Sequence, residues 1–322
     1  MEVKLQNIKN NGKYSSELYK YHYILKIMVM IIIINLFIIT IIINNFKNCL
    51  KYKIYKRPKI IAISYGNQQY QRQLEINKKS ALEVGNVNEY YSFGPDNIDL
   101  EFRNKNKDIL SRKRGNGYWL WKPYFILKTL KEKLNEGDYL IYTDAGILYM
   151  NSTSIIIDFM KEQKVQIWAI QLNHIEKKYT KRDAFILLGA DMPFFTDTPQ
   201  YMAGIQIYQK SKYTEKFLEE VLYYSQDKRI ITDDPNTLGL NNYDGFVDNR
   251  HDQSIFSIMI KKYGQASSGK TNINITQLEK QYIFMPYIFC IYRRTSFTDY
   301  DDIRKKCNNF YIGQKNMFYK NK

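Results

Sequence analysis

The sequence predicts an α/β protein with a mixed, mainly parallel sheet flanked by helices, preceded by a single transmembrane helix. A strand, a helix and a second strand are expected in that order over residues 59–93, and this order is typical of a parallel sheet. Another apolar strand runs into the small turn Asp144-Ala145-Gly146. Near the N-terminus, an almost continuous apolar segment is long enough to cross a membrane.

The N-terminal apolar segment, residues 27–43, has Asn35 and Thr40 as its polar interruptions. Taken as 24–46, it rises about 34 Å as a helix, enough for a hydrocarbon core of about 30 Å. A cleaved signal peptide needs small residues at its cleavage site, but the first alanine of the chain is Ala62. We therefore predict an uncleaved membrane anchor, with a buried helix of a soluble protein as the alternative.

The orientation in the membrane is left open by the flanking charges, because four Lys precede the span and five Lys or Arg follow it. Two glycosylation sequons begin at Asn151 and Asn274 and fit a body in a lumen of the ER or Golgi type. The expected localisation is a single-pass, type II membrane protein.

The net charge of +16 is typical of nucleic-acid-binding proteins, but its distribution argues against that class. Residues 1–57 hold ten Lys or Arg and two acids, which is half of the excess charge. A basic membrane protein that binds nucleic acid is therefore the least favoured function, and we expect no nucleic-acid partner.

Three cysteines, Cys49, Cys290 and Cys307, are too few and too scattered for a disulfide framework or a zinc site. Buried free thiols are the expectation. A single bridge between Cys290 and Cys307 is the alternative.

The rest of the chain alternates apolar segments with helix-spaced segments. Pro123 suits the first turn of a helix and Gly137 suits its end. We expect strands at 59–64, 87–93, 138–150, 165–172 and 204–210, and helices at 69–84, 123–137, 214–226 and 251–264. A late strand pair is expected within 281–292, and a covering tail at 295–315.

Asp144 is the most informative single residue, because it follows an apolar strand and precedes two small residues. Ligands of open α/β sheets bind at the carboxyl ends of strands. A carboxylate there suits a divalent metal that bridges phosphate oxygens, although a turn Asp is an equal alternative. Further along, His251 and Asp252 lie together at a helix start, where either could reach a metal or a sugar hydroxyl, or simply cap the helix.

A tryptophan-rich stretch at residues 114–130 combines cations with aromatic rings. Arg114 and Lys122 could bind phosphate oxygens, and Tyr118, Trp119 and Trp121 could stack on a base or a sugar. Because residues 119 and 121 alternate in an extended chain, we expect one of the two tryptophans in the core and the other in the site.

A weaker signal precedes the predicted strand at 204–210. Gln200, Ala203 and Gly204 stand there, and the small residues would let a substrate approach the backbone.

Together, these pieces resemble nucleotide-sugar glycosyltransferases of the GT-A type, and most closely a branch with three motifs. The motifs read Gly117-Tyr-Trp-Leu-Trp-Lys-Pro123, Gly137-Asp-Tyr-Leu-Ile-Tyr-Thr-Asp-Ala-Gly146 and Arg250-His-Asp-Gln-Ser-Ile-Phe-Ser257. The resemblance implies a Rossmann-like GT-A sheet, a nucleoside-diphosphate sugar donor and a divalent cation such as Mn²⁺ or Mg²⁺. The implied organisation is a tail at 1–23, the anchor at 24–46, a stem at 47–58, a GT-A-like domain at 59–265 and packed C-terminal strands and tail at 266–322.

The resemblance also implies roles for individual residues. Asp144 matches the last acid of the family's DxD motif, but the first position is Tyr142, so the metal would need a second ligand such as His251. Asp252 matches the position that approaches the acceptor or donor sugar and is the candidate catalytic base. The implied nucleotide-sugar-binding residues are Arg114, Tyr118, Trp119, Trp121, Lys122, Gln200, Gly204 and Gln253.

The implied reaction moves a sugar to a hydroxyl group of a glycan, lipid or protein. The departing nucleoside diphosphate needs a cation or several Lys and Arg side chains. Inversion at the sugar requires a base, whereas retention does not, and the sequence leaves both open. The alternative function is a catalytically inactive GT-A-like domain used for binding or as a scaffold, because Tyr142 replaces an acid.

Overall fold

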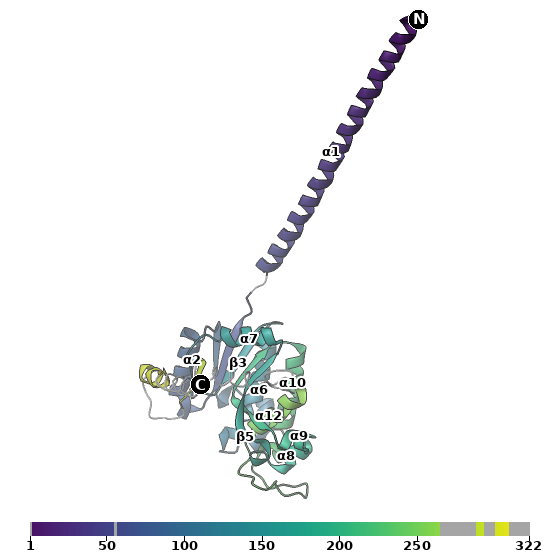
Figure 1. Ribbon diagram of the computed structural model, residues 1–322. Coiled ribbons are helices and arrows are strands. Elements are labelled where there is room, and N and C mark those ends of the chain that lie inside the picture. Colours follow the sequence, from purple (N-terminus) through teal and green to yellow (C-terminus); the bar gives the residue numbers. More distant parts are fainter. Residues whose placement is uncertain (1, 55–56, 265–287, 293–299, 309–322) are drawn as a thin grey trace, which may run out of the picture. The chain divides into compact units, whose positions relative to one another are not determined.

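The computed structural model describes residues 2–54, 57–264, 288–292 and 300–308 (Figure 1). The chain divides into two units, Met1–Arg57 and Pro58–Lys322. The first unit contains helix α1 (Glu2–Ile54), which extends well beyond the predicted anchor. Within it, Lys20–Lys47 is long and apolar enough to cross a membrane, judged by length and composition.

The second unit is built on a five-stranded sheet with the order β2-β1-β3-β6-β5. Its strands are β1 (Ile60–Tyr65), β2 (Glu89–Phe93), β3 (Tyr139–Thr143), β5 (Ile167–Ile175) and β6 (Pro199–Gln209). β1 pairs in parallel with β2 and β3, whereas β6 is antiparallel to both β3 and β5. Four strands therefore run in one direction, which confirms the predicted mixed, mainly parallel sheet.

Helices flank this sheet (Figure 1). They are α2 (Gln71–Glu83), α3 (Leu100–Lys105), α4 (Lys107–Leu110), α5 (Gly115–Tyr118), α6 (Trp121–Lys133), α7 (Ser154–Gln163), α8 (Arg182–Leu187), α9 (Pro193–Thr196), α10 (Lys212–Ser225), α11 (Lys228–Ile231) and α12 (Asp252–Tyr263). The long predicted helices are all present, with ends shifted by a few residues. α6 begins at Trp121 rather than at Pro123, so Pro123 lies inside its first turn.

The central strands are buried on both faces, which explains why their sequences are continuously apolar. Successive side chains of a strand point to opposite faces, and β1 divides its residues accordingly. Ile61 and Ile63 pack with α6, α10 and α12, whereas Ile60 and Ala62 pack in a second core with α7. The sheet therefore has a hydrophobic core on each side.

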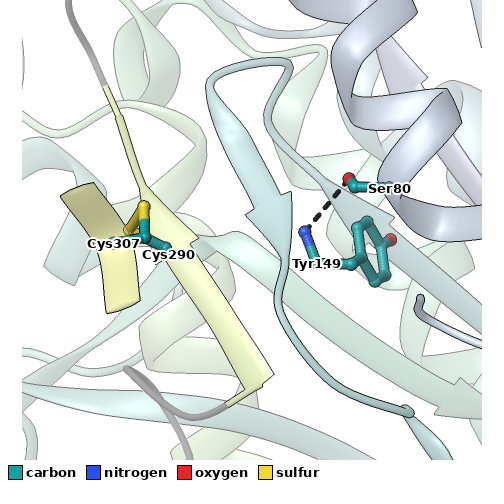
Figure 2. Close-up of a disulfide and its surroundings, with 4 residues drawn as sticks. All are labelled: Ser80, Tyr149, Cys290 and Cys307. Atoms are coloured by element: carbon teal, nitrogen blue, oxygen red, sulfur yellow. Dashed lines mark hydrogen bonds between the residues drawn. A yellow bond between two sulfur atoms is a disulfide. The ribbon is translucent and has the colours of Figure 1, made fainter. Parts of the chain in front are cut away.

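The predicted strand at 138–150 is divided between two sheets. β3 ends at Thr143, and residues 147–149 form β4 (Ile147–Tyr149), which pairs antiparallel with β7 (Phe289–Ile291). The Tyr149 amide also donates to the Ser80 hydroxyl of α2 at 3.1 Å (Figure 2). The turn at 144–146 thus links the two sheets. Of the predicted strand pair and tail, residues 281–287, 293–299 and 309–315 lie outside the described residues.

The expectation of free thiols at Cys290 and Cys307 is wrong, because these residues form a disulfide. Figure 2 shows that it joins β7 to the helical segment 300–308. Cys307 packs with Leu148 and Ile303, so the bridge is part of a small third hydrophobic core that includes a residue of β4. The spacing of the cysteines could not reveal this pairing, because the position of Cys290 depends on the pairing of β7 with β4, which lies far away in the sequence.

We expect the double variant Cys290→Ser/Cys307→Ser to lose about 3 kcal/mol of unfolding free energy, because the bridge closes a loop with a sequence separation of 17 residues. Urea denaturation of the full-length protein in detergent measures this loss. A reducing agent should destabilise the wild type and leave the double variant unchanged. Equal stability of the oxidised wild type and the double variant would contradict the prediction.

Candidate active site

A cleft of about 630 Å³ lies at the carboxyl ends of β1 and β3. Its walls come from the residues after these two strands, from the tryptophan-rich turn before α6 and from the start of α12. The lining residues used below are Tyr65, Lys113, Arg114, Gly115, Asn116, Trp119, Trp121, Lys122, Tyr142, Asp144, Ala203, Gly204, Asp248, His251, Asp252 and Gln253. Both its size and its place in the sheet are typical of a small-molecule site in an α/β protein.

Asp144 lies one residue beyond β3 and points into this cleft, with 45% of its side chain exposed. Its amide donates to the Gly204 carbonyl at 2.9 Å, and its Oδ1 accepts the Tyr142 hydroxyl at 2.7 Å. A Cβ atom on Gly204 would lie 2.9 Å from Asp144 Oδ2. Glycine at position 204 therefore leaves room for this carboxylate, which a larger residue would have to displace.

Lys122 connects the two acidic residues of the site. Its side chain is only 4% exposed, and its Nζ lies 2.6 Å from Asp252 Oδ2 and 3.4 Å from Asp144 Oδ1. The same Nζ donates to the Ala203 carbonyl at 3.3 Å. Burial lowers the pKa of Lys122, but the two carboxylates outweigh it and hold the pKa above its ordinary value. The structure therefore makes this lysine a charged bridge between carboxylates.

Asp252 is the first residue of α12, and its side chain is 10% exposed. Burial raises the pKa of Asp252 to about 6, although the Lys122 ammonium opposes this rise. A carboxylate that is ionised at neutral pH and titrates just below it is suited to accept a proton from a hydroxyl group. Asp252 thus has the environment expected of a general base.

The tryptophan-rich turn has an unusual backbone. All five residues from Gly115 to Trp119 have φ values between 52° and 96°, so the chain makes a left-handed turn. Such a conformation costs roughly 1–2 kcal/mol for each residue with a side chain. A Cβ atom on Gly117 would lie 2.8 Å from the Leu110 Cα, so glycine is required there. Trp121 Nε1 donates to the Gly115 carbonyl at 3.0 Å and helps to hold the turn.

Both tryptophans of this turn border the cleft, but Trp121 also belongs to the hydrophobic core whereas Trp119 is only partly buried, as expected for one core and one site residue. Trp121 is buried and stacks on Tyr65, with ring centroids 3.7 Å apart. Trp119 is half-buried and stacks on the His251 ring at 5.3 Å. Tyr118 is buried beside His251 and is not among the residues that line the cleft.

His251 is turned away from the role of a ligand shared with Asp144. Its Nδ1 donates to the Ile231 carbonyl at 2.7 Å, and its Nε2 faces Asp233 Oδ1 at 3.7 Å. Burial lowers the pKa of His251, so the ring is held neutral near pH 7. Asp233 also pairs with Arg114 at 3.1 Å, so the predicted phosphate-binding arginine already has a carboxylate partner.

The predicted metal ligands do not form a metal site of their own. Asp144 Oδ1 is bonded to Tyr142 and lies beside an ammonium group, and a positive charge there opposes the binding of a cation. Within the described residues, no group of three or more His, Cys, Asp or Glu side chains is placed to hold a metal ion. The residues present do not fit a metal held by the protein alone, and we derive no catalytic step from one.

The two remaining predicted site residues differ in their access to the cleft. Gln253 lines the cleft, whereas Gln200 is fully buried behind it and donates to Glu176. Sequence reasoning missed Tyr65, Lys113 and Asn116, which also line the cleft. Only Tyr65 carried a usable signal, because it follows the first predicted strand.

No protein-family model and no curated protein matches the chain. Among solved structures, it is similar to the WbbM bifunctional glycosyltransferase, with a TM-score of 0.43 and 9% identity over 74% of this chain and 46% of that one. It is similar to the galactosyltransferase LgtC in complex with donor and acceptor sugar analogues, with a TM-score of 0.41 and 13% identity over 73% and 88% of the two chains.

A third similar structure is core-mannan synthase A from Aspergillus fumigatus in its Mn/GDP form, with a TM-score of 0.36 and 11% identity over 66% and 73% of the chains. The chain therefore spans less than half of WbbM and most of the other two proteins. Because all three scores are below 0.5, the likeness by itself assigns no activity to this chain.

We expect Lys122→Met to lower the free energy of unfolding by about 3 kcal/mol, because it leaves the buried Asp252 without its counter-charge. Lys128→Met is the matched control on the same helix. Lys128 pairs with Asp99 at 2.6 Å but is far more exposed, so its loss should cost less than about 1 kcal/mol. Urea denaturation of both variants at pH 7 measures the difference, and equal losses would contradict the assigned role of Lys122.

Proposed function

We propose that this chain is a membrane-anchored glycosyltransferase that moves a sugar from a nucleoside-diphosphate sugar to a hydroxyl acceptor on a glycan, lipid or protein. The observation that carries this proposal is the pair of carboxylates, Asp144 and Asp252, held by one buried lysine at the mouth of the sheet. One carboxylate is half exposed and borders the donor side, and the other has the pKa of a general base.

In this proposal, Asp252 accepts the proton of the acceptor hydroxyl as its oxygen forms a bond to the anomeric carbon of the donor sugar. The bond between that carbon and the diphosphate oxygen breaks, and the electron pair leaves with the nucleoside diphosphate. This course inverts the anomeric centre, and one carboxylate base is sufficient for it. Lys122 stays charged throughout and keeps Asp252 ionised until the proton arrives.

The developing charge of the leaving diphosphate requires positive groups. Lys113 and Arg114 line the cleft beside the tryptophan-rich turn and are exposed. Trp119, half-buried in the same wall, offers an aromatic face to a nucleotide base or a sugar. We propose that this wall holds the donor and that the acceptor enters on the side of Asp252.

The divalent cation implied by the resemblance, Mn²⁺ or Mg²⁺, stays a prediction. Of the three carboxylates that line the cleft in the described residues, Asp144 is the most exposed and could offer an oxygen to such an ion. Most of its coordination would then come from diphosphate oxygens and water, which is common for such ions at phosphate sites. Turnover measured with added Mn²⁺ and with EDTA tests this prediction separately from the transfer itself.

We also propose a single-pass, type II arrangement with the body in a lumen of the ER or Golgi type. The length and composition of α1 support the membrane span. The disulfide between Cys290 and Cys307 supports an oxidising compartment for the body. The sequon at Asn151 is consistent with this side of the membrane.

A panel of nucleotide sugars tests the proposed function in full-length protein in detergent, with water or simple sugars as acceptors. We expect release of nucleoside diphosphate from one donor, and Asp252→Asn should lower kcat about 10²–10⁴-fold because the base is lost. Asp99→Asn is the control, since Asp99 pairs with Lys128 and is not among the residues that line the cleft. Donor binding without turnover in the wild type would instead favour the inactive scaffold.

We expect kcat/KM to rise between pH 5 and pH 8 with a midpoint near 6. Asp252 has a pKa of about 6, so below that pH it is protonated and cannot accept the hydroxyl proton. The residual activity of Asp252→Asn should lack this acidic limb. A wild-type profile that is flat from pH 5 to pH 7 would contradict the role of Asp252 as base.

A further inference from the structure

One buried carboxylate is not used by the mechanism above. Glu176 begins the 3₁₀ turn Glu176–Lys178 after β5, and its side chain is fully buried. Its Oε2 accepts from Lys261 at 2.5 Å and from the Ser257 hydroxyl at 2.6 Å. Its Oε1 accepts from the Thr180 hydroxyl and from Gln200 Nε2, each at 2.9 Å. Burying a carboxylate is costly, and here four donors offset that cost.

A line of hydrogen bonds leads from Glu176 to the cleft. Gln200 donates to Glu176 through Nε2, and its Oε1 accepts from Gln253 Nε2 at 2.9 Å. Gln253 Oε1 in turn accepts from the Ala203 amide at 3.3 Å. The Ala203 carbonyl is the one that Lys122 bonds. The buried carboxylate is thus connected to the central lysine of the site.

The direction of this line is determined at both ends. The two oxygens of Glu176 accept in all four of its hydrogen bonds, so Gln200 must turn its amino group toward it. The backbone amide of Ala203 can only donate, so Gln253 must turn its carbonyl oxygen toward it. Both side-chain amides therefore have one orientation, although an isolated glutamine amide could adopt either of two.

We propose that Glu176 is a positioning residue that orients Gln253 as a hydrogen-bond donor to the cleft. One N–H of Gln253 Nε2 donates to Gln200. Because Gln253 lines the cleft, its second N–H is the one that would donate to a bound ligand. The chemical partner for that N–H is an oxygen of the donor, either a sugar hydroxyl or a phosphate oxygen. The identity of the ligand depends on the function proposed above, whereas the orientation of the two glutamines does not.

Hydrogen exchange tests the orientation without any substrate. In full-length protein in detergent, we expect Glu176→Gln to raise the exchange rate of the Ala203 amide about tenfold, as for the loss of one hydrogen bond. A neutral glutamine at 176 can donate as well as accept, so the longer bond of Gln200 Nε2 to the Tyr179 carbonyl, at 3.3 Å, is then left to favour the present direction of Gln200. Ser257→Ala is the matched control, because it removes a donor to Glu176 and the acceptor of the Tyr201 amide while leaving the hydrogen bonds of Gln200 and Gln253 in place.

A variant in which Glu176 and Gln200 are swapped, called the exchanged variant, supplies a stricter test. In Glu176→Gln/Gln200→Glu, the carboxylate at 200 again accepts from Gln253, so the slow exchange of the Ala203 amide should return. If Glu176→Gln does not fold, Gln200→Met breaks the line in its middle without touching the Glu176–Lys261 pair, and it should also speed exchange. Unchanged exchange in the folded single variants, or no recovery in the exchanged variant, would overturn the proposal.

Donor affinity provides the functional readout, with UDP-glucose, UDP-galactose and GDP-mannose as probes. For the donor that the wild type uses, we expect Glu176→Gln to raise the dissociation constant about tenfold. The pH midpoint of kcat/KM should stay near that of the wild type. A shifted midpoint with unchanged affinity would overturn the assigned role. If none of the probes binds to the wild type, the proposed function fails for these donors, and the exchange rates alone decide the role of Glu176.

Discussion

The site depends on one interaction, the contact of the buried Lys122 ammonium with two carboxylates. Lys122 belongs to α6, Asp144 follows β3, and Asp252 begins α12, so a single charge fixes three elements relative to one another. Because the lysine and Asp252 are almost inaccessible to water, removing either would leave an uncompensated charge in the interior. The same contact favours the ionised form of Asp252 despite its burial.

Two segments with strained backbone conformations lie close to this contact. The left-handed turn from Gly115 to Trp119 ends three residues before Lys122, and His251, with φ of 57°, directly precedes Asp252. Conformations of this kind persist where the surrounding structure holds them, and they are common at functional sites. Here the Trp121 indole, bonded to Gly115 and stacked on Tyr65, is part of what holds the turn. Trp119 and His251, which end these two segments, stack on each other. Lys122 and Asp252 follow them in the chain and are thereby brought together.

Tyr142 shows how the site departs from the motif that the sequence resembles. A second acid at this position would bring another negative charge beside Asp144, whereas the tyrosine donates its hydroxyl to Asp144 and places its ring 5.1 Å from Lys122. The lysine and the tyrosine therefore both stabilise the Asp144 carboxylate. Behind them, the hydrogen-bonded line from Glu176 supports the wall of the cleft that contains Ala203 and Gln253.

The sequence by itself determined the strand and helix types and the apolar N-terminal helix, because periodicity and turn residues are local properties. The order of its motifs also singled out Asp144, Lys122 and Asp252 as candidate site residues. The sequence predicted both the mixed sheet and the strand end that bears Asp144. Only the tertiary structure decided that Lys122 bridges the two acids, that His251 faces Asp233, and that Gln200 lies behind the cleft. It also decided that Cys290 pairs with Cys307 and that residues 147–149 leave the main sheet. The physical reason is that each of these outcomes depends on contacts between segments far apart in the chain, which spacing and composition do not encode.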